Sequence, residues 1–288
     1  MPELPEVETV LRSLLPKIKG KKINTVRVRH KDVVGWPKTV IKFSQGLCGK
    51  KISGGFRRGK LLLFTLNEEE KLIIHLRMTG RLFYMEKCYQ PRKHAHLVLD
   101  FSGGGALIFE DTRRFGRVYL IKTGEEKYAG NLEKLGPEPL DPEFDLETFS
   151  GSLKQRKGRI KGLLLNQSFI AGLGNIYVDE ILFRSQIHPE TTAQHLDDRA
   201  ISKIYSNMKE ILNEAIAGRG TTFRDYRDGE GRAGDFQDLL KVYGREGKEC
   251  PYCVEKIERK KVAGRSSFFC PCCQKDDKND PGSIRKRN

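Results

Sequence analysis

Residues 60–76, KLLLFTLNEEEKLIIHL, contain two short segments rich in aliphatic side chains, KLLLFTL and KLIIHL. Apolar runs of this length are typical of β-strands. Four segments of the same kind occur between residues 23 and 121, and a glycine turn, SGGG at 102–105, separates two of them; the four are INTVRVRH, HLVLDF, ALIFE and GRVYLI. Short strands at such regular spacing predict a β-sandwich or a barrel for the N-terminal half of the chain.

On the N-terminal side of these strands, the chain opens with MPELPEVETV, and apolar side chains recur at helical spacing from Val7 to Leu15. Pro5, Glu6 and Glu8 suit the first turn of a helix, where proline and acidic residues are favoured. The pattern therefore predicts a helix over residues 5–15, and a helix start alone would explain the motif.

On the C-terminal side, LGPEPLDPEFD at 135–145 carries three prolines and several acidic residues, which is typical of a linker. Beyond it the spacing predicts four helices, near 145–156, 159–166, 173–184 and 197–217. The glycine-rich stretch 218–237 is long for a structureless connection, and loops of that length are often functional or disordered. The tail after Cys273 has almost no apolar content, so we expect residues 275–288 to be disordered.

The composition is that of a soluble protein with a polyanionic partner. The 288 residues can bury a sizeable core in one to three domains. No apolar run approaches the roughly 18 residues of a membrane span, and the first twenty residues lack the pattern of a secretory signal, so we expect a cytoplasmic protein without a membrane partner. Lys and Arg number 53 against 38 Asp and Glu, a formal charge of +15. Nucleic acid is the leading candidate partner, and a merely basic soluble surface is the alternative.

The C-terminal cysteines have the spacing C-x2-C-x16-C-x2-C. Two such pairs place four thiolates around one tetrahedral Zn²⁺, and a closed site of this kind is structural. Cys272 could compete for the last position, although the spacing of the first pair favours Cys273. The seven cysteines form an odd set in a chain without a signal, which argues against a disulfide framework. The predicted zinc ligands are Cys250, Cys253, Cys270 and Cys273.

The segment between the cysteine pairs, EKIERKKVAGRSSFF, is basic and resembles a hairpin that could grip a DNA backbone. A second candidate for phosphate binding is GLGNIYVDE, in which Gly172 and Gly174 precede a helix that begins near Asn175. Backbone N–H groups at a helix start bind phosphate. The alternative is that these glycines only form a tight turn between helices.

Four motifs together resemble those of bacterial formamidopyrimidine-DNA glycosylases: MPELPEVETV, DTRRFG, GLGNIYVDE and the four-cysteine finger. These enzymes remove 8-oxoguanine and ring-opened purines from DNA. The resemblance implies an α+β multidomain fold, with an N-terminal β-sandwich and its N-terminal helix, then a helical helix-two-turns-helix domain with a zinc finger. The implied boundaries are 1–131 for the catalytic sandwich, 132–149 for the linker, 150–240 for the helical domain with a lesion-recognition loop at 218–237, 241–274 for the finger and 275–288 for the tail.

The resemblance also implies a mechanism in which the initiator methionine is removed and the Pro2 amine becomes the nucleophile. An α-amino group has a pKa of about 7.7–8.0, so a useful fraction is unprotonated near neutral pH. Attack on C1′ expels the base and leaves a Schiff base that drives β- and δ-elimination. Glu3 would protonate the sugar ring oxygen and Glu6 would organise the N-terminus or a water. Lys60 and Arg265 would bind phosphate and assist the eliminations, although Lys60 alone would be interpreted as a solvated lysine.

The resemblance implies a set of DNA-binding residues as well. Met78, Arg113 and Phe115 would fill the space that a flipped nucleotide leaves, whereas in an unassigned protein Met78 and Phe115 would be interpreted as core. Arg156 stands where the family more often has lysine, which keeps the charge but changes the donor geometry. Lys161 would lie near the lesion pocket and Asn175 would contact phosphate. The full implied set is His75, Met78, His94, Arg113, Phe115, Arg156, Lys161 and Asn175.

Two alternatives remain beside this interpretation. An enzyme of the endonuclease VIII type would have the same chemistry but prefer oxidised pyrimidines; Leu4, the Met78 set and the long 218–237 loop favour the formamidopyrimidine branch. A noncatalytic protein that binds damaged DNA would not need Pro2 or Glu3. We expect a monomer that binds duplex DNA containing oxidised bases or abasic sites.

Overall fold

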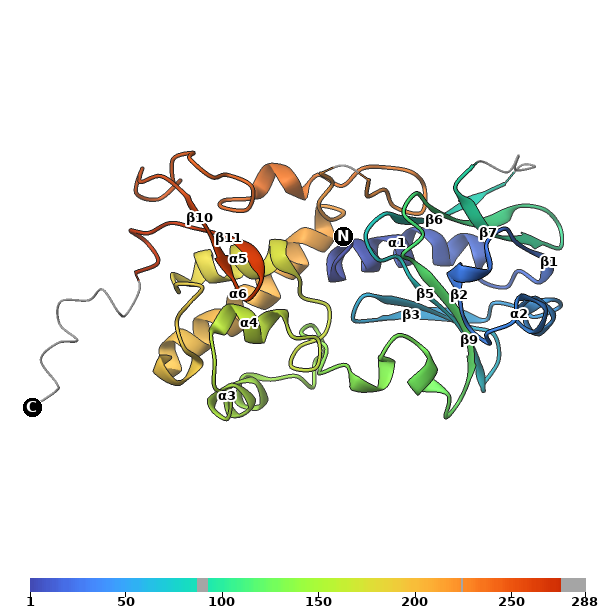
Figure 1. The fold of residues 1–288 in the computed structure, drawn as a ribbon, viewed down its shortest axis with the longest axis horizontal. Helices are drawn as coiled ribbons and strands as arrows, with labels where there is room; N and C mark the ends of the chain where they lie inside the picture. The colour runs from blue at the N-terminus through green and yellow to red at the C-terminus, as the bar shows by residue number, and fades with distance from the viewer. Residues whose placement is uncertain (87–92, 224, 276–288) are drawn as a thin grey trace, which may run out of the picture. The chain divides into compact units, whose positions relative to one another are not determined.

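The computed structural model describes residues 1–86, 93–223 and 225–275, which form two compact units (Figure 1). Unit 1 comprises Met1–Leu135 and Ala215–Gln237, and unit 2 comprises Gly136–Glu214 together with the chain from Asp238 onward. The 218–237 loop, which we predicted as part of the helical domain, therefore belongs to unit 1. The expected disordered tail lies, apart from Lys275, outside the described residues.

Unit 1 contains two β-sheets, one with strand order β1-β7-β8-β6 and one with order β2-β9-β5-β4-β3. Neighbouring strands are antiparallel except β2 and β9, which are parallel. The strands are β1 (Ile23–Val28), β2 (Val34–Trp36), β3 (Gly54–Arg58), β4 (Leu61–Thr65), β5 (Glu70–His75), β6 (Gly80–Met85), β7 (Ala95–Phe101), β8 (Ala106–Asp111) and β9 (Arg117–Lys122). The six predicted strands are all present, and β2, β3 and β6 are additional.

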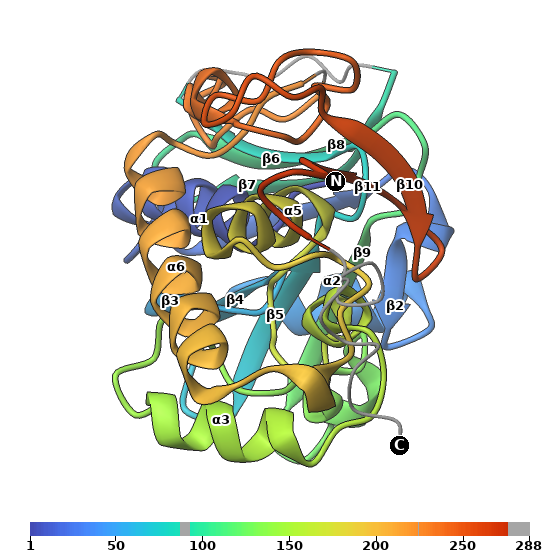
Figure 2. The same cartoon turned by 90° about the vertical axis from the view of Figure 1, so that its left-hand side faces the viewer.

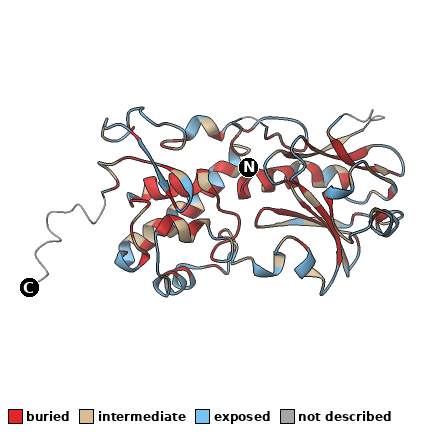
Figure 3. Ribbon diagram, viewed as in Figure 1, coloured by how far each residue is buried: buried red, intermediate tan, exposed pale blue. Residues whose placement is uncertain are grey.

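The core of unit 1 lies between the two sheets and is completed by helix α1 (Leu4–Ile18). Apolar side chains of β4, such as Leu62 and Phe64, share one buried cluster with those of β8, such as Phe109. Val10 and Leu14 of α1 belong to the same cluster, and α1 contacts β3, β4 and β6 (Figures 2 and 3). Because α1 is buried along one face, the residues just before it are held at a fixed place in unit 1.

Unit 1 also contains α2 (Val40–Leu47) and the short 3-10 helices η1 (Lys31–Val33), η2 (Glu126–Tyr128) and η3 (Leu132–Lys134). A further 3-10 helix, η5 (Phe236–Leu239), begins in unit 1 and runs into unit 2.

Unit 2 contains the predicted helices and a β-hairpin. Helix α5 is buried at nearly every position, so its polar residues face protein. The hairpin turns through Ala263 and Gly264, both with positive φ, the conformation that a tight two-residue turn requires. The elements are α3 (Leu146–Lys154), α4 (Ile160–Leu165), α5 (Asn175–Ser185), η4 (Ala193–His195), α6 (Asp198–Ala217), which continues into unit 1, β10 (Glu258–Val262) and β11 (Arg265–Phe269). Among the described residues no helix is long and apolar enough to cross a membrane.

Candidate active site and metal centre

The N-terminal motif places two carboxylates at the start of α1. Pro2 is buried, and Glu3, the residue just before the helix, is 3% exposed. One oxygen of the Glu6 carboxylate accepts the N–H of Glu3 at 2.7 Å, and the other accepts the N–H of Thr221 at 2.7 Å. A single buried carboxylate therefore fixes both the residue beside Pro2 and the beginning of the 218–237 loop.

The first residues of this loop are fitted closely around Glu6. Gly220 has a φ of +79°, and a Cβ on it would lie 2.8 Å from a Glu6 carboxylate oxygen, so a side chain is excluded there. The Tyr226 hydroxyl donates to the backbone carbonyls of Arg219 and Glu6 at 3.1 and 3.3 Å. Burial, followed by the nearby Glu6 charge, raises the pKa of Tyr226, so the hydroxyl keeps its proton and remains a donor.

Lys60 and His75 lie at adjacent strand ends in the five-stranded sheet. Lys60 is buried in the turn between β3 and β4, directly after Gly59, and His75 at the end of β5 is paired with Leu61. His75 Nδ1 accepts the N–H of Arg77 at 3.1 Å. Burial, with smaller contributions from the Arg77 and Lys60 charges, lowers the pKa of His75 to about 3. The His75 ring is therefore neutral at neutral pH and can act through hydrogen bonds but not through charge.

The structure brings Met78, Arg113 and Phe115 together at the surface of unit 1. Met78 is 44% exposed and Phe115 is 47% exposed, so neither is a core residue. The Arg113 guanidinium carbon lies 4.6 Å from the Phe115 ring centroid, and Arg113 Nη1 lies 3.3 Å from the Met78 sulfur. The three side chains thus form one exposed apolar and cationic group, which suits insertion into a base stack.

Asp111, a residue that sequence reasoning missed, holds the two loops that carry this group. Its buried carboxylate accepts the Thr79 hydroxyl and the N–H groups of Arg113 and Gly116, the latter two at 3.1 and 2.7 Å. Its backbone N–H donates to the carbonyl of His94, whose side chain is half-buried. The only sequence signal was its place at the head of DTRRFG.

In unit 2, Lys161 is fully buried, unlike Arg156 and Arg265. Its ammonium donates to the Asp179 carboxylate at 2.6 Å and to the Ser266 carbonyl at 3.1 Å, and the Asn175 side chain donates to the same carbonyl at 2.8 Å. The second Asp179 oxygen accepts the N–H of Phe268 at 3.0 Å. These contacts attach β11 to helices α4 and α5, so Lys161 does not present its charge to solvent.

The two other basic candidates in unit 2 are exposed. Arg265 begins β11 directly after the hairpin turn, and the Arg156 guanidinium lies 5.7 Å from the Phe169 ring centroid. Both can therefore reach a phosphate in solvent.

Glu180, next to Asp179 in GLGNIYVDE, provides a second attachment for the C-terminal segment. Its buried carboxylate accepts the N–H groups of Lys241, Val242 and Tyr243 at 2.9, 3.0 and 2.9 Å. The acidic pair of this motif therefore anchors the finger, a role that the sequence did not reveal because its partners lie more than 60 residues away.

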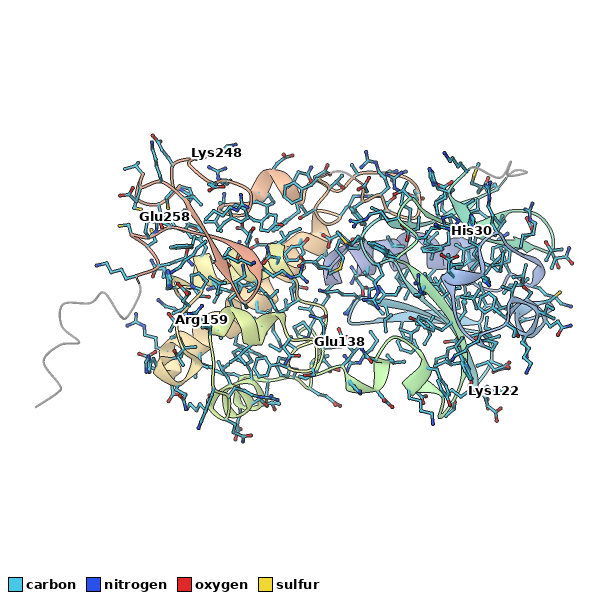
Figure 4. The ribbon with its side chains drawn as sticks, in the orientation of Figure 1. His30, Lys122, Glu138, Arg159, Lys248 and Glu258 are labelled. Carbon is cyan, nitrogen blue, oxygen red and sulfur yellow. The ribbon has the colours of Figure 1, made fainter. Side chains whose placement is uncertain are left out.

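The four predicted cysteine ligands converge on one point. Their sulfurs lie within 4.8 Å of one another, with Cys250 and Cys273 at 3.8 Å and Cys253 and Cys270 at 3.4 Å. Sulfurs about 2.3 Å from a tetrahedral ion are about 3.8 Å apart, so the donor set fits zinc. Cys272 is exposed and outside this group. The first cysteine pair lies between Lys248 and Glu258 in the chain, both labelled in Figure 4.

Comparison with known proteins decides the family. Residues 1–118 match the family described as the formamidopyrimidine-DNA glycosylase N-terminal domain, and residues 135–226 match its H2TH domain. The formamidopyrimidine-DNA glycosylase of Pelotomaculum thermopropionicum is 48% identical, across 96% of this chain and 99% of that protein. The chain belongs to the formamidopyrimidine-DNA glycosylase family. The relative from Heliobacterium modesticaldum is 47% identical, with 96% of this chain and 100% of that protein covered.

Solved structures of formamidopyrimidine-DNA glycosylases have the same fold. The Lactococcus lactis enzyme in complex with abasic-site DNA matches with a TM-score of 0.87 at 40% identity, and covers 95% of this chain and 100% of its own. The same enzyme with DNA containing an oxidised pyrimidine matches with a TM-score of 0.87 at 39% identity, over 96% of this chain and 100% of that one. A variant of it in complex with Fapy-dG DNA matches with a TM-score of 0.88 at 39% identity, over the same shares.

Proposed function

We propose that this protein is a bifunctional DNA glycosylase and abasic-site lyase of base excision repair, which removes oxidised purines through its N-terminal proline. The observation that carries the proposal is the arrangement of Glu3 and Glu6 next to Pro2 at the start of α1. Glu3 stands beside the amine position at the start of a buried helix, and Glu6 fixes the Glu3 backbone at 2.7 Å. A nucleophile that forms part of the main chain requires this kind of support.

In this mechanism, removal of Met1 gives the Pro2 nitrogen a free lone pair. The nitrogen attacks C1′ and gives up its proton, and the glycosidic bond breaks with its electrons leaving on the base, which takes up a proton. The C1′–O4′ bond then opens as O4′ receives a proton, which leaves an iminium between the Pro2 nitrogen and C1′. The resulting iminium acidifies C2′, whose proton is removed as the 3′ phosphate leaves; loss of the 5′ phosphate follows, and water releases the sugar fragment.

The remaining candidate residues have three roles: proton transfer, phosphate binding, and filling the space that the flipped nucleotide leaves. Glu3 protonates the sugar ring oxygen, while Lys60 and Arg265 bind phosphates and assist the eliminations. Met78, Arg113 and Phe115 occupy the space of the flipped nucleotide, as their contacts and exposure support. His75 and His94 belong to the same DNA-facing set.

The contacts in unit 2 support a revised role for Lys161. Its burial against Asp179 and Ser266 makes it a positioning residue for the strand that begins with Arg265, whereas Arg156 and Asn175 remain candidate phosphate contacts. One structural Zn²⁺ held by the four cysteines would keep the hairpin folded. We propose a catalytic sandwich domain at residues 1–131, a linker at 132–149, a helical domain at 150–240 and a zinc finger at 241–274, with DNA-binding residues in the sandwich, the helical domain and the finger.

The partner we propose is duplex DNA that carries oxidised bases or abasic sites, bound by a monomer in the bacterial cytoplasm. The named lesions in the complexes of the Lactococcus lactis enzyme support this substrate class. The formal charge of +15 supports a polyanionic partner.

The test uses duplexes with a single 8-oxoguanine opposite cytosine, a single thymine glycol, or a single abasic site. We expect release of 8-oxoguanine and a one-nucleoside gap with phosphates on both sides. Faster excision of thymine glycol would move the protein to the endonuclease VIII type, and tight binding without excision of either base would leave a noncatalytic damage-binding protein.

A further inference from the structure

The 218–237 loop contains a buried carboxylate that none of the proposed chemistry uses. Asp228 is 2% exposed, and its carboxylate forms an ion pair with the Arg219 guanidinium. The same carboxylate accepts the N–H groups of Glu230 and Arg232, each at 2.9 Å. Asp228 therefore closes residues 228–232 into a tight turn and joins that turn to Arg219, two residues after the end of α6.

This turn is also fixed to α1 and to β6. Gly229 donates its N–H to the Ser13 hydroxyl at 2.9 Å, and its carbonyl accepts the Tyr84 N–H at 3.3 Å. A Cβ on Gly229 would lie 2.4 Å from Leu14, so the backbone itself packs on the helix. Lys17 pairs with Glu230 at 2.8 Å. Residues 226–232 thus form an anchored segment of the loop.

Arg219 connects the anchored segment 226–232 to the residues that contact Glu6. It has a φ of +60°, which is uncommon for a residue with a side chain and must be held by its surroundings. Its side chain binds Asp228 and its carbonyl accepts the Tyr226 hydroxyl, while the next two residues, Gly220 and Thr221, contact the Glu6 carboxylate. A change at Asp228 therefore alters the support of residues 219–221 of the loop, whereas Glu6 keeps its own hydrogen bond to the Glu3 N–H.

We propose that Asp228 is a positioning residue that orders residues 219–221 and 226–232 of this loop before DNA binds, and that it thereby sets the preference for base-bearing lesions over abasic sites. The inference rests on the proposed function, in which the loop covers the flipped base. Ordering the loop in advance removes an entropic cost from base recognition. An abasic site presents no base to the loop, so its cleavage does not gain from this order.

The test compares Asp228→Asn with Asp235→Asn, a matched change at an exposed carboxylate of the same loop. Without DNA, we expect trypsin to cleave Asp228→Asn after Arg232, a site whose flanking residues are unchanged, at least tenfold faster than it cleaves the unsubstituted protein. The kcat/KM for 8-oxoguanine excision should fall about tenfold, and nicking of an abasic site should change less than twofold. Asp235→Asn should behave as the unsubstituted protein does in all three assays.

Unchanged trypsin cleavage of Asp228→Asn, or equal losses on the two DNA substrates, would overturn the proposal. Should Asp228→Asn fail to fold, as judged by its thermal transition, Arg219→Gln breaks the same ion pair and the same criteria apply. Failure of the unsubstituted protein to excise any base would refute the proposed function alone, because the protease comparison still decides whether Asp228 orders the loop.

Discussion

At the scale of single residues, buried carboxylates fix the geometry around the candidate site. Glu6, Asp111 and Glu180 each accept two or more hydrogen bonds from backbone N–H or hydroxyl groups. The resemblance in sequence indicated Glu6 but not its link to Thr221, 215 positions away. Such partners are created by tertiary folding, so residue spacing along the chain could not predict them.

Asp111→Asn should lower the rate at which the protein flips a nucleotide out of the duplex. The asparagine NH₂ group would face at least one of the three hydrogen-bond donors that now bind the Asp111 carboxylate. That donor would lose its acceptor, and leaving a buried donor unsatisfied costs about 1–3 kcal/mol of stability. We expect the Met78 and Arg113 loops to separate, and the flipping rate, followed by 2-aminopurine fluorescence beside the lesion, to fall about tenfold. The control is Asp100→Asn, which alters a carboxylate on β7 that pairs with Arg27. An equal loss of flipping rate in both variants would contradict the role of Asp111.

His75 should make unfolding depend on pH. Its pKa is about 3 in the folded state, against an ordinary 6.5, so the unfolded chain binds more protons between these values and the folded state loses stability as the pH falls from 6.5. The slope from this residue is at most about 1.4 kcal/mol per pH unit. Denaturant unfolding between pH 5 and 6.5 should give a flatter profile for His75→Asn, whereas the exposed control His195→Asn should keep the slope. Parallel profiles for His75→Asn and the unsubstituted protein would refute this explanation.

At the scale of secondary structure, sequence periodicity predicted the elements that bury a continuous apolar face. Helix α1 and the strands β4 and β5 are examples. It missed β3, GGFRR, because an edge strand with two glycines and two arginines lacks the apolar pattern of a strand. It also missed α2 and the partly exposed β6. The cysteine spacing predicted the cluster of four sulfurs, because residues that are to share one ion are constrained in their spacing.

Cys272 and Cys273 should differ in metal binding despite being neighbours. Cys273 contributes its sulfur to the four-sulfur cluster and Cys272 is exposed. We expect purified Cys272→Ser to contain one equivalent of zinc and Cys273→Ser to contain less than a tenth of that, as measured by elemental analysis. Zinc retained by Cys273→Ser and lost by Cys272→Ser would reverse the ligand assignment.

At the scale of the whole molecule, the family resemblance spans both units, and net charge agrees with it. The +15 charge indicates a polyanionic partner. The match to a relative over 96% of the chain narrows the function to that of a DNA repair glycosylase. Composition alone could not choose between catalysis and binding, because a basic surface serves both. That choice depends on whether the amine of residue 2 reacts.

The most direct test is borohydride reduction of the protein with a duplex containing 8-oxoguanine, after intact-mass analysis has confirmed loss of Met1. We predict a stable covalent adduct that peptide mapping places on Pro2, and its absence in Glu3→Gln and in protein that retains Met1. A correctly processed protein that excises the base but gives no adduct, or an adduct that maps to a lysine instead, would contradict the proline mechanism.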